Sequence, residues 1–148
     1  MIKCTVAIPF YNRKNDVLGP VAIDSALEQH LSEMEILLID DCSTDGTWEL
    51  LQKVCDPRVR LVRNERRLGL FGNFSRCLEL ARGEYVRLLC SDDSLMPDCL
   101  NQEIAMMDQH PNAVILATRG RRVDGKGAVL GTLGDHFHPG IYSGSSAI

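Results

Sequence analysis

Residues 34–51 read MEILLIDDCSTDGTWELL, and this stretch decides the predicted fold. A nearly continuous apolar run ends in two acids, Asp40 and Asp41, and such a run is typical of a strand buried on both faces. Cap-forming residues follow the acids and precede apolar side chains at helical spacing. A buried strand followed directly by a helix predicts one unit of an α/β protein.

The rest of the chain repeats this alternation of strand and helix. Helically spaced apolar residues separate the strand-like runs, and Pro97 suits the first turn of the last helix. The pair Asp124-Gly125 predicts a hairpin over 123–130. Together these elements predict an α/β fold, with a largely parallel sheet covered by helices on both faces. The strand-like runs span 4–10, 34–41, 59–64, 84–90 and 113–118.

Composition argues against several classes of protein. Of 148 residues, 45% are hydrophobic and 24% are charged, as in an ordinary globular domain. The net charge of −4, without basic runs, argues against a nucleic-acid partner. No run approaches the roughly 18 apolar residues of a membrane span, so we expect no span in this chain. Six cysteines occur without CxxC spacing, which favours free thiols and a cytoplasmic location.

Three polar clusters follow predicted strands, where ligands of open α/β sheets bind. They are PFYNR (9–13), DDCSTDGT (40–47) and SDD (91–93). Paired carboxylates suit a hard divalent cation, Mg²⁺ or Mn²⁺, which often bridges to the phosphates of a ligand. The chain has neither a GxGxxG segment after its first strand nor a GxxxxGK[ST] loop. We therefore expect a nucleotide diphosphate that is held through a metal ion.

Three segments resemble the nucleotide-sugar-binding half of family 2 glycosyltransferases. They are TVAIPFYNR, EILLIDDCSTDGTWELL and ARGEYVRLLCSDDSLMPDCL, and the similarity extends from about residue 4 to about residue 131. The resemblance implies the GT-A fold, a Rossmann-like three-layer α/β/α sandwich. It also implies a nucleotide-sugar-binding domain over 1–131, followed over 132–148 by an irregular tail or by the start of an acceptor-binding segment.

The resemblance also implies roles for individual residues. Pro9 and Tyr11 would contact the nucleoside, and Asp41 would hydrogen-bond the base, often uracil. Asp92 would face the ribose or the sugar, and Asp93 would bind the metal ion. The expected donor is a nucleotide sugar, most often a UDP-sugar, and the acceptor is a glycan, a lipid or a protein.

Other polar residues of these clusters have less specific expectations. Asp40 and Asp45 are expected to accept hydrogen bonds within a loop or a helix cap. Arg66 and Arg67 precede Gly69 and are expected in a solvated loop, with contact to phosphate as the alternative.

Cys90 departs from the family pattern, because an acid usually occupies this position, two residues before Asp92. We expect its apolar side chain to point into the core of the sheet, which leaves the metal to Asp92 and Asp93.

The resemblance implies an inverting sugar transfer, which needs a carboxylate base on the acceptor side. No segment after Leu130 fits that base, so we expect this chain to be a donor-binding half without its catalytic base. Two alternatives stay open: a non-catalytic nucleotide-sugar-binding or assembly module, and a nucleotidyltransferase, although PFYNRKND lacks the glycine- and basic-rich loop of that class. A cytoplasmic enzyme is expected, with peripheral association at the inner membrane face as an open option.

Overall fold

The computed structural model describes residues 1–16, 18–136 and 138–143. The chain divides into two compact units, Met1–Gln109 and His110–Ile148. In the first unit, strands and helices alternate as the sequence predicts. The strands are β1 (Cys4–Phe10), β2 (Met34–Asp40), β3 (Val59–Arg63) and β4 (Tyr85–Leu88), and the helices are α1 (Leu18–Leu27), α2 (Thr47–Leu51), α3 (Gly69–Leu80) and α4 (Cys99–Gln109).

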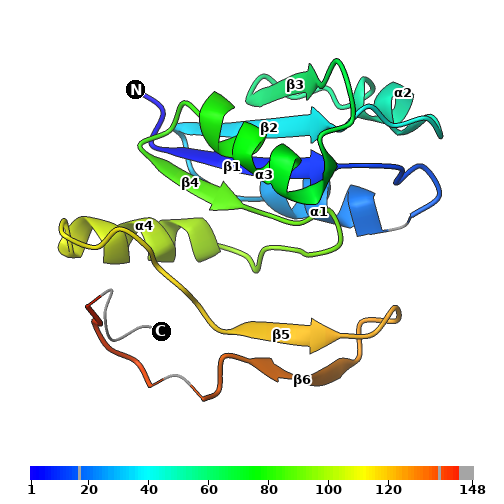
Figure 1. The fold of residues 1–148 in the computed structure, drawn as a ribbon. Coiled ribbons are helices and arrows are strands. Elements are labelled where there is room, and N and C mark those ends of the chain that lie inside the picture. Colours follow the sequence, from blue (N-terminus) through cyan, green and yellow to red (C-terminus); the bar gives the residue numbers. More distant parts are fainter. Residues whose placement is uncertain (17, 137, 144–148) are drawn as a thin grey trace. The chain divides into compact units, whose positions relative to one another are not determined.

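The four strands of the first unit form one parallel sheet in the order β3-β2-β1-β4 (Figure 1). The central strands β1 and β2 are buried at every residue. They pair in register from Cys4 with Met34 to Phe10 with Asp40. Apolar side chains on both sides of these strands require cover on both faces of the sheet, which helices supply.

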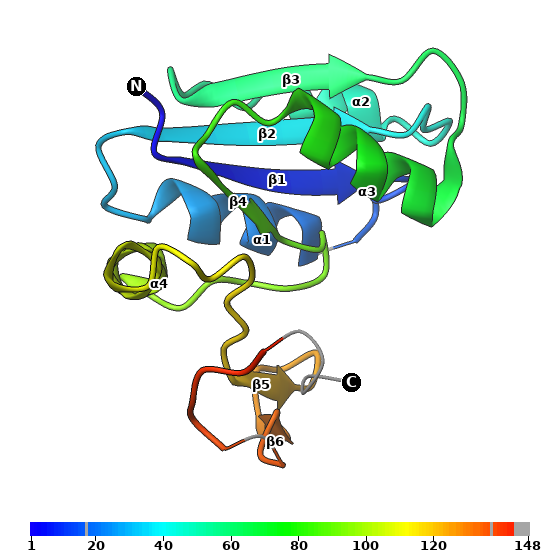
Figure 2. The same cartoon turned by 60° about the vertical axis from the view of Figure 1, so that its left-hand side comes forward.

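Two apolar clusters, one on each face of the sheet, make up the core. Alternate residues of β1, including Val6 and Ile8, pack with residues of α1, α2 and α4. The intervening residue Ala7 packs on the other face against Cys77 of α3. Figure 2 shows α3 and α1 on opposite sides of the sheet. The predicted three-layer α/β/α sandwich with a parallel sheet is therefore confirmed.

The strand order reverses direction beside β1. From β1 the chain moves outward to β2 and β3, and it then returns to place β4 on the other side of β1. In open α/β sheets, a ligand binds beyond the carboxyl ends of the strands at such a reversal. The loops that follow β1 and β4 therefore occupy the favoured position for a site.

Helix α4 starts later than the sequence predicts. Pro97 was expected in its first turn, but the helix begins at Cys99. Asp98 has a left-handed backbone with φ of 60°, which cannot continue a right-handed helix. Its carbonyl oxygen accepts the hydrogen bond from the backbone N–H of Gln102, so Asp98 flanks the helix and Pro97 lies outside it.

The second unit contains an antiparallel hairpin of β5 (Gly120–Val123) and β6 (Val129–Leu133), which confirms the predicted turn region. Its loop is longer than the predicted two-residue turn at Asp124-Gly125. The Asp124 carboxylate accepts hydrogen bonds from the backbone N–H groups of Lys126 and Ala128. Gly127 supplies the positive φ of 83° that the loop needs.

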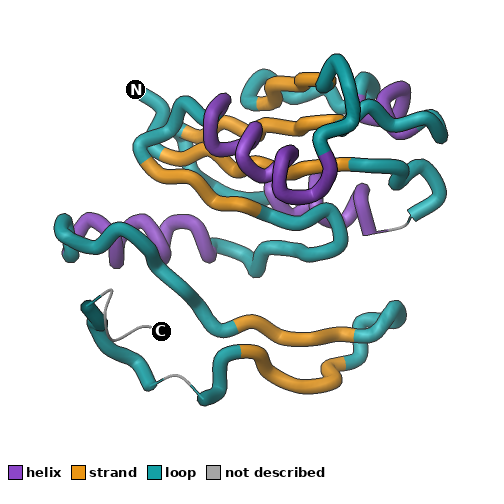
Figure 3. The backbone as a smooth tube through the Cα atoms, in the orientation of Figure 1, coloured by secondary structure: helices purple, strands orange, loops and turns teal. Residues whose placement is uncertain are grey.

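The predicted strand over 113–118 is wrong. Residues 113–119 form irregular chain, which Figure 3 shows as a loop between α4 and β5. The run is apolar enough for a strand, but a strand also needs a neighbouring ladder of backbone hydrogen bonds. Within this unit, β6 pairs with 120–123 instead. In the described part of the chain, every helix is too short or too polar to serve as a membrane span.

Candidate functional site

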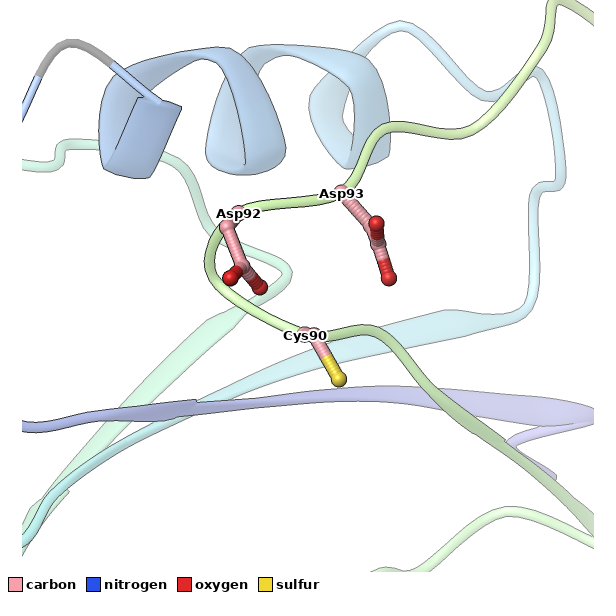
Figure 4. Close-up of side chains that lie close together, drawn as sticks. All are labelled: Cys90, Asp92 and Asp93. Carbon is pink, nitrogen blue, oxygen red and sulfur yellow. The ribbon is translucent and has the colours of Figure 1, made fainter. Parts of the chain in front are cut away.

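The turn that follows β4 gathers three side chains that can bind a metal ion. Pairing with β1 continues to Leu89, whose N–H donates to the Ala7 carbonyl at 3.0 Å. The backbone then turns, and the Asp93 N–H donates to the Cys90 carbonyl at 3.0 Å. The turn brings the Cys90 sulfur and one carboxylate oxygen each of Asp92 and Asp93 within 4.8 Å of one another. Figure 4 shows these three side chains around the turn, and we call them the Cys90 cluster.

The expectation that Cys90 points into the core is therefore wrong. Its neighbours Leu89 and Ser91 are the buried residues, at 3% and 5% exposure, whereas Cys90 is half-buried. The turn begins directly after Leu89, and it places the Cys90 side chain beside the two acids. Burial raises the pKa of the Cys90 thiol, and the negative charges of Asp93 and Asp92 raise it further.

Arg13 connects the loop after β1 to the Cys90 cluster. Its guanidinium forms ion pairs with Asp16, in its own loop, and with Asp92 across an N–O distance of 3.5 Å. The Asp92 side chain is half exposed, so this longer pair adds little to stability, at most about 1 kcal/mol. The ion pair matters for the site because it places the positive charge of Arg13 beside the carboxylates of Asp92 and Asp93, where the strand order reverses.

Asp41 lies at the end of β2 and is almost fully buried, at 2% exposure. Its Oδ1 accepts hydrogen bonds from the Asn64 side chain at 2.8 Å and from the Leu68 N–H at 2.7 Å. Its Oδ2 accepts one from the Gly69 N–H at 2.8 Å. Asp41 therefore fastens the loop before α3 to the sheet, a role that the sequence does not reveal because its partners lie 23 to 28 residues away.

Tyr11 and Pro9 lie on the same edge as Asp41. Pro9 is buried in β1 opposite Ile39, and Tyr11 follows the strand and is half-buried. The Arg67 guanidinium lies over the Tyr11 ring, 4.0 Å from its centroid. Arg67 thus belongs to the surroundings of Tyr11, although its exposed position in the loop before Gly69 had favoured a solvated side chain.

Short polar side chains join the loop after β1 to the loop after β2. The Asn12 and Arg13 N–H groups donate to Ser43 Oγ and Thr47 Oγ1 at 2.9 and 2.7 Å. In return, the Thr44 N–H donates to Asn12 Oδ1 at 3.0 Å. Sequence reasoning missed Asn12, Ser43 and Thr47, and the only signal was their place in clusters at strand ends.

Asp40 and Asp45 have the loop and cap roles that the sequence suggests. Asp40 accepts a hydrogen bond from the Ser43 N–H and pairs with Arg63 at 3.2 Å. Asp45 accepts hydrogen bonds from the N–H and the hydroxyl of Thr47 and from the Lys14 N–H. Partial burial acts to raise the pKa of Asp45, but these hydrogen bonds outweigh it and the pKa is lowered. Neither acid is a member of the Cys90 cluster.

The Cys90 cluster has the chemistry and the size to hold one divalent ion. Ligand bonds to such ions are about 2.0–2.3 Å long, so two ligands on opposite sides of an ion lie about 4–4.6 Å apart. The three donor atoms lie within 4.8 Å of one another, which requires only small side-chain adjustments around an ion. Carboxylate oxygens suit Mg²⁺ and Mn²⁺, and a thiolate adds a softer ligand.

The sequence matches a known protein family. The family model described as Glycosyl transferase family 2 matches residues 5–135. One curated relative is WfaP of Escherichia coli, named UDP-Glc:alpha-D-GlcNAc-diphosphoundecaprenol beta-1,3-glucosyltransferase. It is 33% identical over 104 residues, which cover 70% of this chain and 41% of WfaP.

Two solved structures share the fold. S. aureus TarS 1–349 in complex with UDP-GlcNAc superposes with a TM-score of 0.66 at 27% identity, over 74% of this chain and 32% of that one. The mannosyltransferase PcManGT from Pyrobaculum calidifontis, in complex with GDP-Man and Mn²⁺, superposes with a TM-score of 0.58 at 26% identity, over 65% and 29%. This chain therefore spans less than half the length of the relatives it matches. It has the GT-A fold, and with 5–135 of its 148 residues matched it belongs to glycosyl transferase family 2.

Proposed function

We propose that this chain is the donor-binding part of an inverting glycosyltransferase, which transfers a sugar from a nucleoside-diphosphate sugar to an acceptor hydroxyl. The observation that carries the proposal is the Cys90 cluster beside Arg13 at the reversal of strand order. Family membership supports the reaction class. The relatives solved with UDP-GlcNAc and with GDP-Man support a nucleotide-sugar donor, and we favour a UDP-sugar.

The nucleoside would lie along the ends of β1 and β2, against Pro9 and Tyr11. Asp41 would accept a hydrogen bond from the base. Its Oδ1 already accepts two hydrogen bonds and its Oδ2 accepts one, which leaves one acceptor position on Oδ2. A single remaining acceptor suits the single ring N–H of uracil.

The diphosphate would lie toward the Cys90 cluster. Asp93 would bind Mg²⁺ or Mn²⁺, and Asp92 would face the ribose or the sugar. When bound, the ion neutralises charge on the diphosphate leaving group. The Mn²⁺ in the PcManGT complex supports this assignment. Arg13 would hold Asp92 in place through its ion pair.

We assign no general base within this chain, and the acceptor stays open among a glycan, a lipid and a protein. The name of WfaP includes a diphosphoundecaprenol-linked sugar, which supports a lipid-linked acceptor. We propose a nucleotide-sugar-binding region over 1–131 and a cytoplasmic location, with peripheral association at the inner membrane face. The second candidate is a non-catalytic nucleotide-sugar-binding or assembly module, and the thiol in place of an acid at Cys90 favours it.

Calorimetry with the 148-residue chain tests donor binding. UDP-glucose, UDP-GlcNAc and GDP-mannose are titrated with Mn²⁺ and again with EDTA. We expect at least one donor to bind with Mn²⁺, and we expect at least a tenfold loss in EDTA and in Asp93→Asn. Asp24→Asn, an exposed acid on α1, is the matched control and should bind as the parent does. Failure of every donor to bind with Mn²⁺ contradicts the proposal, and donor binding that is unchanged in EDTA and in Asp93→Asn contradicts the role of the metal ion.

A further inference from the structure

We infer that Cys90 binds the divalent ion through its sulfur, together with Asp92 and Asp93, so that this site prefers Zn²⁺, Co²⁺ and Mn²⁺ over Mg²⁺. The inference rests on the proposed function in one respect: the same cluster holds the ion. It adds Cys90 and Asp92 as ligands beside Asp93, and the resulting order of metal preference.

Placement distinguishes Cys90 from the other thiols of the protein. Cys4 and Cys77 are buried in the two apolar clusters, at 2% and 0% exposure, where they act as small hydrophobic side chains. Cys90 is half-buried, and its sulfur lies in one group with two carboxylates. Among the described residues, this is the one group of three or more His, Cys, Asp and Glu side chains whose ligand atoms are close enough to share an ion.

The local backbone makes the arrangement compact. All three ligands come from four consecutive residues (Figure 4). The hydrogen bond from the Asp93 N–H to the Cys90 carbonyl closes this turn. The ligands are therefore held near one another before an ion arrives, which reduces the ordering that binding requires. The sulfur lies within 4.8 Å of the carboxylate oxygens that would hold the ion.

Charges around the cluster offset part of the negative charge of the bound state. A thiolate and two carboxylates carry three negative charges against the two positive charges of the ion. The Arg13 guanidinium lies 3.5 Å from the Asp92 carboxylate, but it also pairs with Asp16, so it offsets only part of the remaining charge. The Cys90 thiol would lose its proton to the solvent on binding the ion, as sulfur ligands of metals do.

The sulfur decides the metal preference. Mg²⁺ requires oxygen ligands at about 2.0–2.1 Å in near-octahedral geometry, and a sulfur ligand removes one of them. Zn²⁺ accepts a mixture of sulfur and oxygen ligands, with Zn–S bonds of about 2.3 Å. For a given set of nitrogen, oxygen and sulfur ligands, affinity also rises from Mn²⁺ to Co²⁺. A sulfur ligand therefore favours binding of these transition-metal ions over binding of Mg²⁺.

Optical spectroscopy with Co²⁺ tests the sulfur ligand without any need for a donor or for turnover. Binding of Co²⁺ should produce a near-ultraviolet sulfur-to-metal charge-transfer band in the parent chain. The band should be lost in Cys90→Ser and kept in Cys55→Ser, which removes an exposed thiol. Zn²⁺ affinity, measured by competition with a chromophoric chelator, should fall at least about tenfold in Cys90→Ser.

A second variant separates ligand chemistry from misfolding. Cys90→Asp places an all-oxygen set in the same turn, so it should bind Mg²⁺ more tightly than the parent and lose its preference for Zn²⁺. An unchanged Co²⁺ band in Cys90→Ser, or equal affinities of the parent for Mg²⁺ and Zn²⁺, would overturn the inference. Neither result affects the proposed function, which fails only when no donor binds with any ion.

Discussion

The Asp41 carboxylate accepts a hydrogen bond from the Asn64 side-chain amide at 2.8 Å, and this contact ties the end of β2 to the loop before α3. The same carboxylate also accepts two backbone N–H groups of that loop. One buried acid therefore holds the loop before α3, and Arg67 of this loop lies against the Tyr11 ring. Loss of this acid should affect both stability and the proposed nucleoside site.

Asp41→Asn should lower the free energy of unfolding by about 2–3 kcal/mol, because its NH₂ group would face hydrogen-bond donors that need an acceptor. The same variant should bind the donor at least about tenfold more weakly, since the anchored loop is released. Urea denaturation and calorimetry provide the two measurements. Glu65→Gln, an exposed acid in the same loop, is the control, and equal stability of the two variants would refute the anchoring role.

Glu35 should make stability depend on acid pH. Burial acts to raise its pKa, but the hydrogen bond and charge of Arg60 and the hydrogen bond from Thr5 outweigh it, so the folded pKa lies below the ordinary value of 4.5. The stabilisation is then fully present above the unfolded pKa and is lost as pH falls through the folded pKa. Urea midpoints from pH 6 to pH 2.5 should fall more steeply for the parent than for Glu35→Gln. Parallel profiles would show that this ion pair adds no pH-dependent stability.

At neutral pH, Glu35→Gln should itself cost about 1–3 kcal/mol of unfolding free energy, because it leaves the partner guanidinium without its charge. Glu33→Gln is a suitable control, since Glu33 is an exposed residue just before β2. The site lies at the opposite, carboxyl end of the strands, so donor affinity should change little.

Gly83→Ala should destabilise the sheet. A Cβ atom at Gly83 would lie 2.5 Å from the Thr5 backbone nitrogen and 2.7 Å from the Cys4 carbonyl carbon, which are backbone atoms of β1. The expected loss is about 3 kcal/mol, the upper part of the range for overpacking. Gly125→Ala, where an added Cβ meets open space, should leave the thermal midpoint unchanged. An equally stable Gly83→Ala would mean that the start of β4 shifts freely.

Arg67→Ala should weaken donor binding about two- to fivefold with little change in stability. The guanidinium covers one face of Tyr11, and such an exposed contact contributes about 0.5–1 kcal/mol. Arg67→Lys keeps the charge but loses the planar stacking surface, so it should recover only part of the affinity. Arg66→Ala is the neighbouring control. If Arg67→Ala and the parent bind the donor with the same affinity, Arg67 has no part in donor binding and is a solvated side chain.

The sandwich was predictable because its central strands are apolar on both sides, a pattern that few other structures produce. Residues 36–39 show this most clearly, and all of them are fully buried. The run over 113–118 has the same composition, yet it is not a strand, because composition does not say which neighbour will supply the ladder. The start of α4 was missed for a local reason, the left-handed backbone at Asp98.

The edge that carries the candidate site was predictable, but the partners of its side chains were not. Strand ends identify which loops meet, whereas hydrogen bonds such as that between Asp41 and Gly69 depend on how segments far apart in the chain approach one another. Cys90 was placed wrongly because the apolar character of its side chain was taken to mean burial in the core of the sheet. The turn after Leu89 places the sulfur beside the two acids instead.

The hydrogen bonds between the loops after β1 and β2 have an entropic consequence. Asn12, Ser43 and Thr47 hold backbone N–H groups of the opposite loop. Each residue that is fixed in advance removes about 1–2 kcal/mol of ordering cost from a later binding event. Because folding already orders these loops, a donor that binds at this edge has a smaller entropy cost to overcome. More of the free energy of its contacts then appears as affinity.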